Sequence, residues 1–379
     1  MHIVVISRAW PSSEHSGVSL AAAAHVEMLV ELGYAVSIIG STESVLRENL
    51  PVARRFYVPA SGSGALYAPA KVDQHRLLNA MLEVRPELVV IEAWQTALTD
   101  AAIDVAFNLR IPVLMISHGV SLHSFSNRWS DKIRALGWMM YRYHRLPRLI
   151  SRVSAITVLS EYGASPRFYD RNVAYRLGIP TTVLGNFPVH WNDTRPAHSQ
   201  RKRQVVVIGY FSAVKNQLNA LEVLRQLPGD VSMLFIGQRK GKYYGRCVKR
   251  AKDLGLLNRI YFSEDHECDI SEEVSRSQVV LSTSITEALP ICLLEAMACG
   301  TPFVATPVGA VPSLEVGLIH ADCTSQAKAV LNLLDDPLYW ESCSIRGIVQ
   351  FEKRFSKSRI REQLAAAVEL ACRRLMLPD

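Results

Sequence analysis

Short apolar runs alternate with longer amphipathic stretches through the first half of the chain. The apolar runs have the length of buried strands, and the stretches between them repeat their apolar residues at helical spacing. In chain order, these predicted elements cover residues 2–6, 18–32, 36–39, 72–84, 88–91 and 113–116. Strands that alternate with helices are typical of a doubly wound parallel sheet. We therefore expect an α/β fold for this half.

The alternation starts again at residue 204. The second series consists of strands at 204–208, 231–236, 260–262, 279–281 and 303–305, with helices from Lys215 and Tyr243. The segment between the two series is polar and charged and has no periodicity, which is typical of a linker. We therefore predict an N-terminal domain at 1–188, a linker at 189–203, a second domain at 204–355 and a final helix at 356–379.

Composition agrees with two folded domains. A length of 379 residues exceeds the usual size of a single core. The hydrophobic share of 49% and the charged share of 20% are those of a globular protein and make extensive disorder improbable. All seven cysteines lie in the second half without a Cys-x-x-Cys pair, so we expect neither a disulfide framework nor a zinc site.

Charge and hydropathy limit the possible cellular location of the protein and the possible classes of binding partner. The first residues lack the basic leader and the long apolar region of a signal peptide, and no later stretch is long enough to span a bilayer. We expect a cytoplasmic protein. A net charge of +7 indicates an acidic partner, which is a nucleotide, a nucleic acid or an anionic membrane.

The most informative segment is 286–306, TEALPICLLEAMACGTPFVAT, which holds Glu287 and Glu295 eight positions apart. A polar turn leads from the strand at 279–281 to Pro290, a residue that favours the first turn of a helix. The free N–H groups at such a helix start attract anions such as a nucleotide diphosphate. The carboxylates can accept hydrogen bonds from sugar hydroxyls. Taken alone, however, the two carboxylates favour the simpler interpretation of a solvated turn glutamate and an ordinary glutamate on a helix face.

Further candidates follow other predicted strands, because open α/β sheets bind ligands at the carboxyl ends of their strands. Gly17 opens the helix after the first strand, and its backbone N–H group would suit a phosphate. Ser117-His118-Gly119 follows the strand at 113–116. Gly209 and Lys215 follow the first strand of the second series.

The segment with the two glutamates resembles the donor-binding motif of retaining glycosyltransferases of family 4, which have the GT-B fold. That motif is a Glu, seven residues, and a second Glu followed by Ala-Met-Ala-x-Gly-x-Pro, and the chain has EAMACGTP from Glu295. The resemblance implies two Rossmann-like domains that face each other across a cleft, with the last helix crossing back to the N-terminal domain. It also implies transfer of a sugar from a nucleotide-diphosphate sugar with retention of configuration. No cofactor or metal is expected, because no Asp-x-Asp occurs at a suitable place.

The resemblance also assigns roles to residues. Glu287 would hold the hydroxyls of the transferred sugar, Glu295 the ribose and Lys215 the diphosphate. His118 would contact the donor sugar or its developing charge, although a lone histidine can also be a structural residue. The expected catalytic residues are His118, Glu287 and Lys215. The expected donor-binding residues are Gly17, Gly209, Lys215, Glu287, Ala288, Leu289, Pro290, Ile291 and Glu295.

Two positions depart from the family pattern. Ser16 stands where family members usually have the first of two glycines, and Tyr210 stands where they usually have an arginine. Without that arginine, either Lys215 acts alone on the diphosphate, or Arg239 or Lys240 takes its place. The basic run 239–252 is otherwise typical of a solvated helix face.

A second basic stretch, 128–152, mixes arginine and lysine with tryptophan, methionine and tyrosine. This composition suits an amphipathic helix on an anionic membrane, but also a surface helix whose aromatics face the core. A lipid-linked glycan acceptor would favour the membrane, and therefore a position on the inner face of the cell membrane. The expected membrane contacts are Arg128, Lys132, Arg134, Arg142 and Arg145. Nucleic acid is not expected, because no stacking platform or recognition helix is evident.

We therefore expect a glycosyltransferase that acts on a glycan acceptor in the assembly of cell-surface polysaccharide or lipopolysaccharide. Two alternatives stay open. One is a related phosphorylase, which would release sugar phosphate when given inorganic phosphate, or a related epimerase, which would need no acceptor. The other is a peripheral membrane protein that binds nucleotide sugars without turnover, which the departures at Ser16 and Tyr210 would permit.

Overall fold

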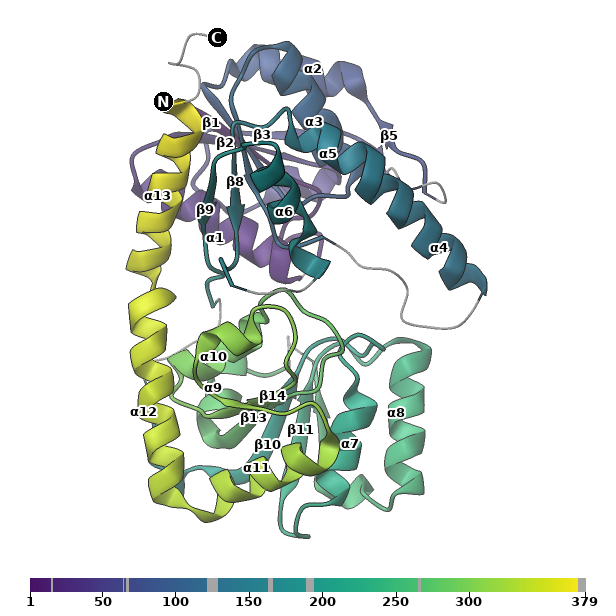
Figure 1. Cartoon of the computed structure of the whole chain (residues 1–379), viewed down its shortest axis with the longest axis vertical. Helices are drawn as coiled ribbons and strands as arrows, with labels where there is room; N and C mark the ends of the chain where they lie inside the picture. Colours follow the sequence, from purple (N-terminus) through teal and green to yellow (C-terminus); the bar gives the residue numbers. More distant parts are fainter. Residues whose placement is uncertain are drawn as a thin grey trace. The chain divides into compact units, whose positions relative to one another are not determined.

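The computed structural model describes residues 1–14, 16–63, 65, 68–120, 129–162, 166–188, 194–264 and 267–373. The chain forms two compact units (Figure 1). The first consists of Met1–Gly185 together with Lys357–Asp379, and the second of Asn186–Ser356. Each unit is described by itself below.

The first unit is built on a sheet of seven parallel strands in the order β3-β2-β1-β6-β7-β8-β9. The strands are β1 (His2–Ser7), β2 (Ala35–Gly40), β3 (Arg54–Tyr57), β6 (Leu88–Glu92), β7 (Val113–Ile116), β8 (Ala155–Val158) and β9 (Thr181–Val183). The chain order reverses between β1 and β6. Ligands of open α/β sheets bind at the carboxyl ends of the strands at such a reversal.

Helices and short elements complete the first unit. The helices are α1 (Gly17–Glu31), α2 (Gln74–Val84), α3 (Ala97–Asn108), α4 (Trp129–Met140), α5 (Leu146–Ile150), α6 (Tyr169–Arg176) and α13 (Lys357–Arg373). The short elements are β4 (Ala60–Ser61), β5 (Lys71–Val72), η1 (Glu43–Arg47), η2 (Tyr141–Arg145) and η3 (Pro166–Phe168). The turn η2 is π-helical and lies between α4 and α5.

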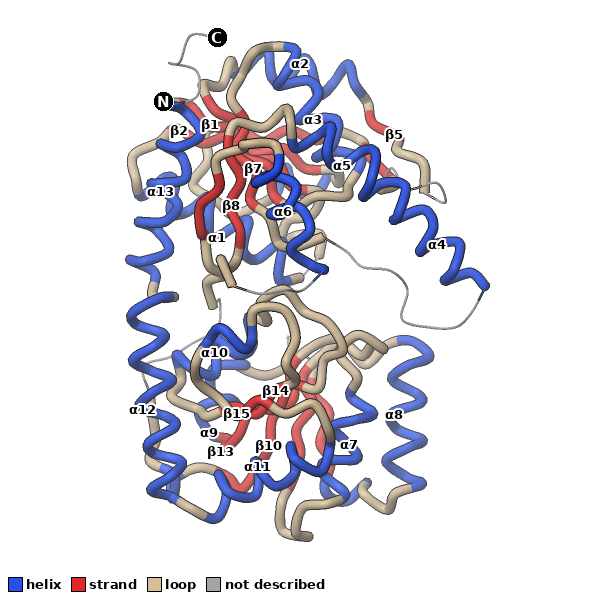
Figure 2. The backbone as a smooth tube through the Cα atoms, in the orientation of Figure 1, coloured by secondary structure: helices blue, strands red, loops and turns tan. Residues whose placement is uncertain are grey.

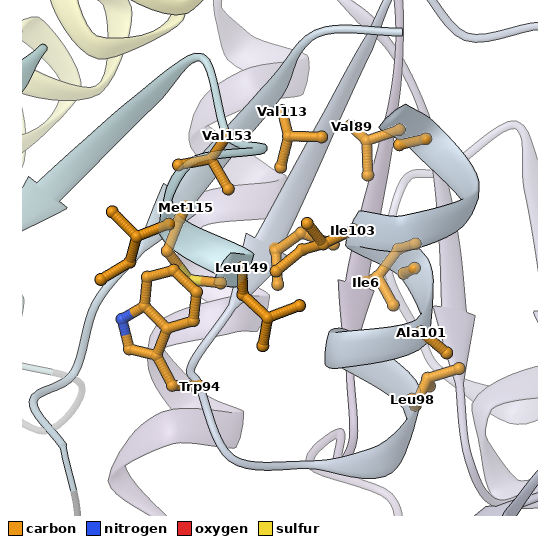
Figure 3. Close-up of a cluster of buried hydrophobic side chains, with 14 of the residues drawn as sticks. Ile6, Val89, Trp94, Leu98, Ala101, Ile103, Val113, Met115, Leu149 and Val153 are labelled. Carbon is orange, nitrogen blue, oxygen red and sulfur yellow. The ribbon is translucent and has the colours of Figure 1, made fainter. Parts of the chain in front are cut away.

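The core of this unit lies between the sheet and helices α3 and α5. Ile6 and Met115 point from the strands toward Ile103 and Leu149 of the helices, and Trp94 lies at the edge of the same cluster (Figure 3). The central strands β1, β6 and β7 are almost wholly apolar, as expected for parallel strands that are buried on both faces.

The second unit has six parallel strands in the order β12-β11-β10-β13-β14-β15, shown in red in the lower part of Figure 2. They are β10 (Lys202–Ile208), β11 (Ser232–Ile236), β12 (Ile260–Ser263), β13 (Ser277–Ser282), β14 (Phe303–Ala305) and β15 (Leu318–Ile319). The helices are α7 (Gln217–Arg225), α8 (Gly241–Asp253), α9 (Ile270–Arg276), α10 (Ile291–Ala298), α11 (Cys323–Asp335) and α12 (Pro337–Arg354). Three 3₁₀ turns, η4 (His198–Gln200), η5 (Leu257–Arg259) and η6 (Val311–Leu314), complete the unit.

The predicted fold class, two Rossmann-like α/β domains with parallel sheets, is confirmed. Some element ends differ from the prediction. Strand β10 begins at Lys202 rather than at Gln204, because the polar residues before the apolar run already pair with β13. Helix α7 begins at Gln217 and not at Lys215, which lies in the preceding turn.

None of the helices in the described ranges combines the length and the apolar character needed to cross a membrane.

Candidate functional site

Glu287 and Lys215 lie together in the second unit. The Lys215 Nζ atom is 2.7 Å from Glu287 Oε1, and the Ser284 hydroxyl donates to the same oxygen at 3.1 Å. Both side chains are largely buried. Burial opposes the charge of Lys215, but the charge and the hydrogen bond of Glu287, together with smaller contributions from Cys292 and Tyr210, outweigh it and raise the pKa of Lys215. A cation is therefore held beside a carboxylate in the loops that follow β10 and β13, where the strand order of this sheet reverses.

The turn after β10 is shaped around the Lys215 side chain. A Cβ atom on Gly209 would lie only 3.0 Å from Lys215 Cε, so the absence of a side chain lets the lysine pack against the backbone. The buried amide of Gln217 donates to the carbonyls of Gly209 and Tyr210 at 3.1 and 3.0 Å. Gln217, which the sequence did not indicate, thus fixes the predicted phosphate turn.

Hydrogen bonds to backbone carbonyl groups hold the segment from Glu287 to the start of α10. The Leu289 carbonyl accepts a hydrogen bond from Asn186 Nδ2 at 2.7 Å, and the Ala288 carbonyl accepts one from the Ala310 N–H at 2.7 Å. Gly309 has a φ of +55°, and a Cβ there would lie 2.1 Å from the Glu287 carbonyl oxygen, so only glycine permits this approach. Pro290 precedes Ile291 at the start of α10 and provides no side-chain cap.

Glu295 lies on α10 and is only 4% exposed. One turn earlier, Cys292 is also buried, and burial raises the pKa of its thiol to about 12. The charge of Lys215 opposes this increase in the pKa of Cys292, whereas those of Glu295 and Glu287 add to it, so the thiol lies within the electrostatic influence of all three. The structure thus brings Lys215 and Glu287 into contact and buries Glu295 and Cys292 on the helix that follows Glu287.

The position that departs from the family pattern, Tyr210, is 57% exposed. Of the two cations considered as substitutes, Arg239 has carboxylate partners: its Nε atom is 3.5 Å from Glu264 Oε1, and its Nη2 atom pairs with Glu267. Lys240 is exposed ahead of α8. Lys215 is therefore the cation that lies next to Glu287, and the charge of Arg239 is already compensated.

In the first unit, Ser16 and Gly17 form the start of α1. The Ser16 hydroxyl accepts a hydrogen bond from the Ser19 N–H, and the Ser19 hydroxyl accepts one from the Ser16 N–H, which completes a capping box. Gly17 is exposed at the first helical position. Ser16, which stands where the family pattern has a glycine, thus caps helix α1 with its hydroxyl group.

His118 follows β7 and has an acidic partner that the sequence did not reveal. Its Nε2 atom is 2.7 Å from Glu92 Oε2, and the other oxygen of Glu92 is 2.8 Å from His25 Nδ1. The two imidazole rings have centroids 6.4 Å apart. One signal for Glu92 was present in the sequence, since it is the charged residue that ends an otherwise apolar predicted strand at 88–91.

The predicted membrane cations have different environments. Arg142 stacks over the Tyr169 ring at 3.8 Å, and Arg145 Nε is 2.9 Å from Asp100 Oδ2. Lys132 lies over the Trp129 ring at 5.6 Å and is exposed. Arg128 and the side chain of Arg134 lie outside the described residues. The guanidinium groups of Arg142 and Arg145 therefore contact protein groups, which leaves Lys132 as the outward cation among the described three.

Within the part of the chain that the structure describes, no group of three or more His, Cys, Asp or Glu side chains is arranged to hold a metal ion.

Comparisons with known proteins agree with the fold. Residues 192–345 match the family model of glycosyl transferases group 1. N-acetyl-alpha-D-glucosaminyl L-malate synthase of Bacillus anthracis is 24% identical over 175 residues, which span 44% of this chain and 45% of that relative. Lipopolysaccharide core biosynthesis mannosyltransferase LpsB of Rhizobium meliloti (strain 1021) is 25% identical over 264 residues, 62% of this chain and 69% of that relative.

Among solved structures, Anabaena HepE in complex with UDP superposes with a TM-score of 0.72 at 18% identity. The superposition covers 97% of this chain and 100% of that chain. The likeness therefore extends over both units and concerns the fold.

Proposed function

We propose that the chain is a glycosyltransferase that uses a nucleotide-diphosphate sugar, because residues 192–345 match the family model of glycosyl transferases group 1. The observation that carries the proposal is the ion pair of Lys215 and Glu287 at the reversal of the second sheet. A buried cation beside a carboxylate suits a ligand that carries both phosphate and sugar hydroxyls.

The residues of the second unit have separate roles in this proposal. Lys215 and the uncapped N–H groups at the start of α10 would bind the diphosphate and stabilise its charge as the bond to the sugar breaks. Glu287 would then accept hydrogen bonds from the transferred sugar, and Glu295 from the ribose. Because HepE was solved with UDP, uridine is the first base to test.

In the first unit, His118 would contact the transferred sugar. Retention of configuration follows only from the family resemblance. The reaction would then rely on electrostatic stabilisation of the leaving diphosphate and on the position of the acceptor hydroxyl. A glycan acceptor in polysaccharide or lipopolysaccharide assembly is supported by the similarity to LpsB. The similarity to N-acetyl-alpha-D-glucosaminyl L-malate synthase makes a small hydroxy acid the second candidate.

The donor site can be tested by titration calorimetry with UDP- and GDP-sugars. We expect one of them to bind, and Glu295→Ala to weaken that binding by about tenfold or more through loss of a charged hydrogen bond. Glu341→Ala, which changes an exposed glutamate on α12, is the control and should bind like the wild type. No binding at all, or full affinity in Glu295→Ala, would contradict the assignment.

Catalytic turnover has to be measured separately from the binding of the donor. We expect mass spectrometry to detect a product heavier by one sugar when the bound donor is mixed with a lipid-linked glycan, and the anomeric proton coupling of the product to show retention. Sugar phosphate formed from inorganic phosphate would instead identify a phosphorylase. A changed sugar nucleotide without an acceptor would identify an epimerase.

We also propose that the protein is peripheral to the inner face of the cell membrane, through helix α4. Figure 1 shows α4 running outward from the body of the first unit. Four of its exposed apolar residues recur at helical spacing and form one stripe, which we call the α4 stripe: Trp129, Ile133, Leu136 and Met140. Such a stripe beside the exposed cation Lys132 suits an anionic lipid surface.

A further inference from the structure

Glu92 is a fully buried carboxylate at the reversal of the first sheet. It is the last residue of β6, its side chain is 0% exposed, and it pairs in register with Ser7 at the end of β1. Both of its oxygens face imidazoles, His25 at 2.8 Å and His118 at 2.7 Å. Burial opposes ionisation, but the two histidines that face the carboxyl group outweigh it and lower the pKa of Glu92 to about 2.

An ionised carboxylate can only accept hydrogen bonds, so each ring nitrogen that faces Glu92 must carry a proton. His118 is thereby held with its proton on Nε2, and His25 with its proton on Nδ1. We propose that Glu92 is the positioning residue of His118, which presents its Nδ1 atom to a sugar hydroxyl. This inference rests on the proposed function for its chemistry, but the ring tautomer is a property of the protein alone.

The loops that carry Glu92 and His118 are fixed by a second buried carboxylate. Asp170 accepts hydrogen bonds from Trp94 Nε1 at 2.7 Å and from the hydroxyl of Ser117. Trp94 lies two residues after Glu92, and Ser117 directly precedes His118. One side chain of α6 therefore ties together the ends of two neighbouring strands.

The loop after Glu92 is also strained. Ala93 and Gln95 have φ values of +66° and +69°, in the left-handed region that is unfavourable for residues with a side chain. The strain is held by Trp94, which is anchored to Asp170, and by the Gln95 N–H group, which donates to the Tyr141 hydroxyl at 3.2 Å. Strain of this kind persists where the surrounding structure determines a functional geometry.

His25 also contacts Glu92, although one of its ring nitrogens is left without a hydrogen-bond partner in the described part of the chain. Its Nε2 atom is buried and has no hydrogen-bond partner among the residues that the structure describes. A buried acceptor without a partner destabilises the folded protein, so His25 is poorly satisfied as a purely structural residue. The contact between His25 and Glu92 has an explanation in the second oxygen of Glu92, which needs a hydrogen-bond donor. The Nδ1–H group of His25 is that donor, and it keeps the carboxylate ionised and oriented toward His118. Carboxylate and histidine pairs fix a tautomer and stabilise an imidazolium in this way.

Nitrogen NMR of the wild-type protein, labelled with ¹⁵N in its histidine rings, tests the tautomers. We expect His118 to show a protonated Nε2 and an unprotonated Nδ1, and His25 to show the reverse. The variant His75→Asn removes the signal of an exposed ring on α2 and checks the assignment. A proton on Nδ1 of His118, or a mixture of tautomers, would overturn the inference, and this measurement needs no variant of Glu92.

Glu92→Gln provides the second test. A glutamine offers one acceptor and one donor, so one of the two rings must change tautomer or lose its hydrogen bond. We expect the ring spectrum to change and kcat to fall on the order of 100-fold, while the dissociation constant of UDP measured by calorimetry stays within twofold. Glu27→Gln, an exposed residue on the same helix as His25, should keep both spectrum and kcat.

The outcomes separate the inference from the proposed function. A folded Glu92→Gln protein with an unchanged ring spectrum and wild-type kcat overturns the inference, even where the transferase activity is established. If the wild-type protein forms no product from any nucleotide sugar, the proposed function fails, and the wild-type tautomers still decide whether Glu92 positions His118.

Discussion

Single residues in both units carry charges inside the protein, and the surrounding groups decide how each charge is held. Lys215 keeps its charge beside Glu287, and Glu92 keeps its charge between two imidazoles. Asp100 is a contrasting case. It accepts hydrogen bonds from the Tyr141 hydroxyl and from Arg145 Nε, each at 2.9 Å, yet burial outweighs them and raises the pKa of Asp100 to about 7.

The pKa of Asp100 predicts a pH dependence of stability. Folded Asp100 binds its proton more tightly than an unfolded aspartate, whose ordinary pKa is 3.8. The stability that this proton contributes is therefore present at low pH and is lost as the pH rises from about 4 to about 7. Asp100→Asn removes this component, so we expect the stability of the wild type relative to the variant to fall across that window.

Urea unfolding at pH 5, 6, 7 and 8 measures this difference in the free energy of unfolding. The difference should change by at most about 1.4 kcal/mol per pH unit and become flat above pH 8. A difference that stays constant from pH 5 to pH 8 would show that Asp100 is ionised throughout.

Sequence reasoning could propose candidate site residues where the information is local. Glu287 and Glu295 stand in one continuous segment that contains a strand, a turn and a helix, so their spacing was informative. Glu92 was missed because its role depends on His25, which is 67 positions away, and on His118. A single glutamate after an apolar run does not indicate which distant rings will meet it.

At the scale of elements, the hydrophobic alternation predicted the central strands of both sheets and helices α1, α2, α7 and α8, but not longer helices such as α3 and α11. It missed short elements such as β4 and β5, because pairs of two residues have no periodicity to detect. The basic stretch at 128–152 was predicted as one amphipathic helix, whereas α4 continues into the π-helical turn η2 and then α5. The structure therefore separates the cations of η2, which contact protein groups, from the apolar stripe of α4.

The α4 stripe predicts lipid binding that depends on apolar contact. The double variant Ile133→Ser, Leu136→Ser should reduce flotation with vesicles that contain anionic lipid, because it removes two exposed apolar side chains from the centre of the stripe. The matched control is Leu82→Ser on α2, where an exposed leucine has the same substitution. Equal flotation of the wild type with neutral and anionic vesicles, or of the double variant and the wild type, would count against a membrane role.

At the scale of the whole molecule, the first unit is assembled from two distant parts of the chain. Helix α13 contributes buried apolar residues, among them Ile360, Leu364 and Val368. Its Lys357 Nζ atom is 2.5 Å from Glu31 Oε1 on α1, and its Gln363 side chain accepts a hydrogen bond from the Gly185 N–H at 3.0 Å.

A chain that ends at Ser356 should therefore lose stability in the first unit. Each large apolar side chain of α13 that is no longer buried removes about 1.5–3 kcal/mol. Hydrogen exchange with mass spectrometry should show faster exchange in β1 and α1 and unchanged exchange in β10 and β13. Uniformly faster exchange in both units would mean that they unfold as one cooperative body.

The membership of α13 in the first unit also has a consequence for the order in which the protein folds in the cell. A ribosome releases residues 357–379 only after the whole second unit has emerged, so that unit can fold while the earlier one still lacks a helix. During this interval the apolar residues that α13 covers are open to water. The newly made first unit is thus the part of the chain that we expect chaperones to bind, because its apolar residues are exposed.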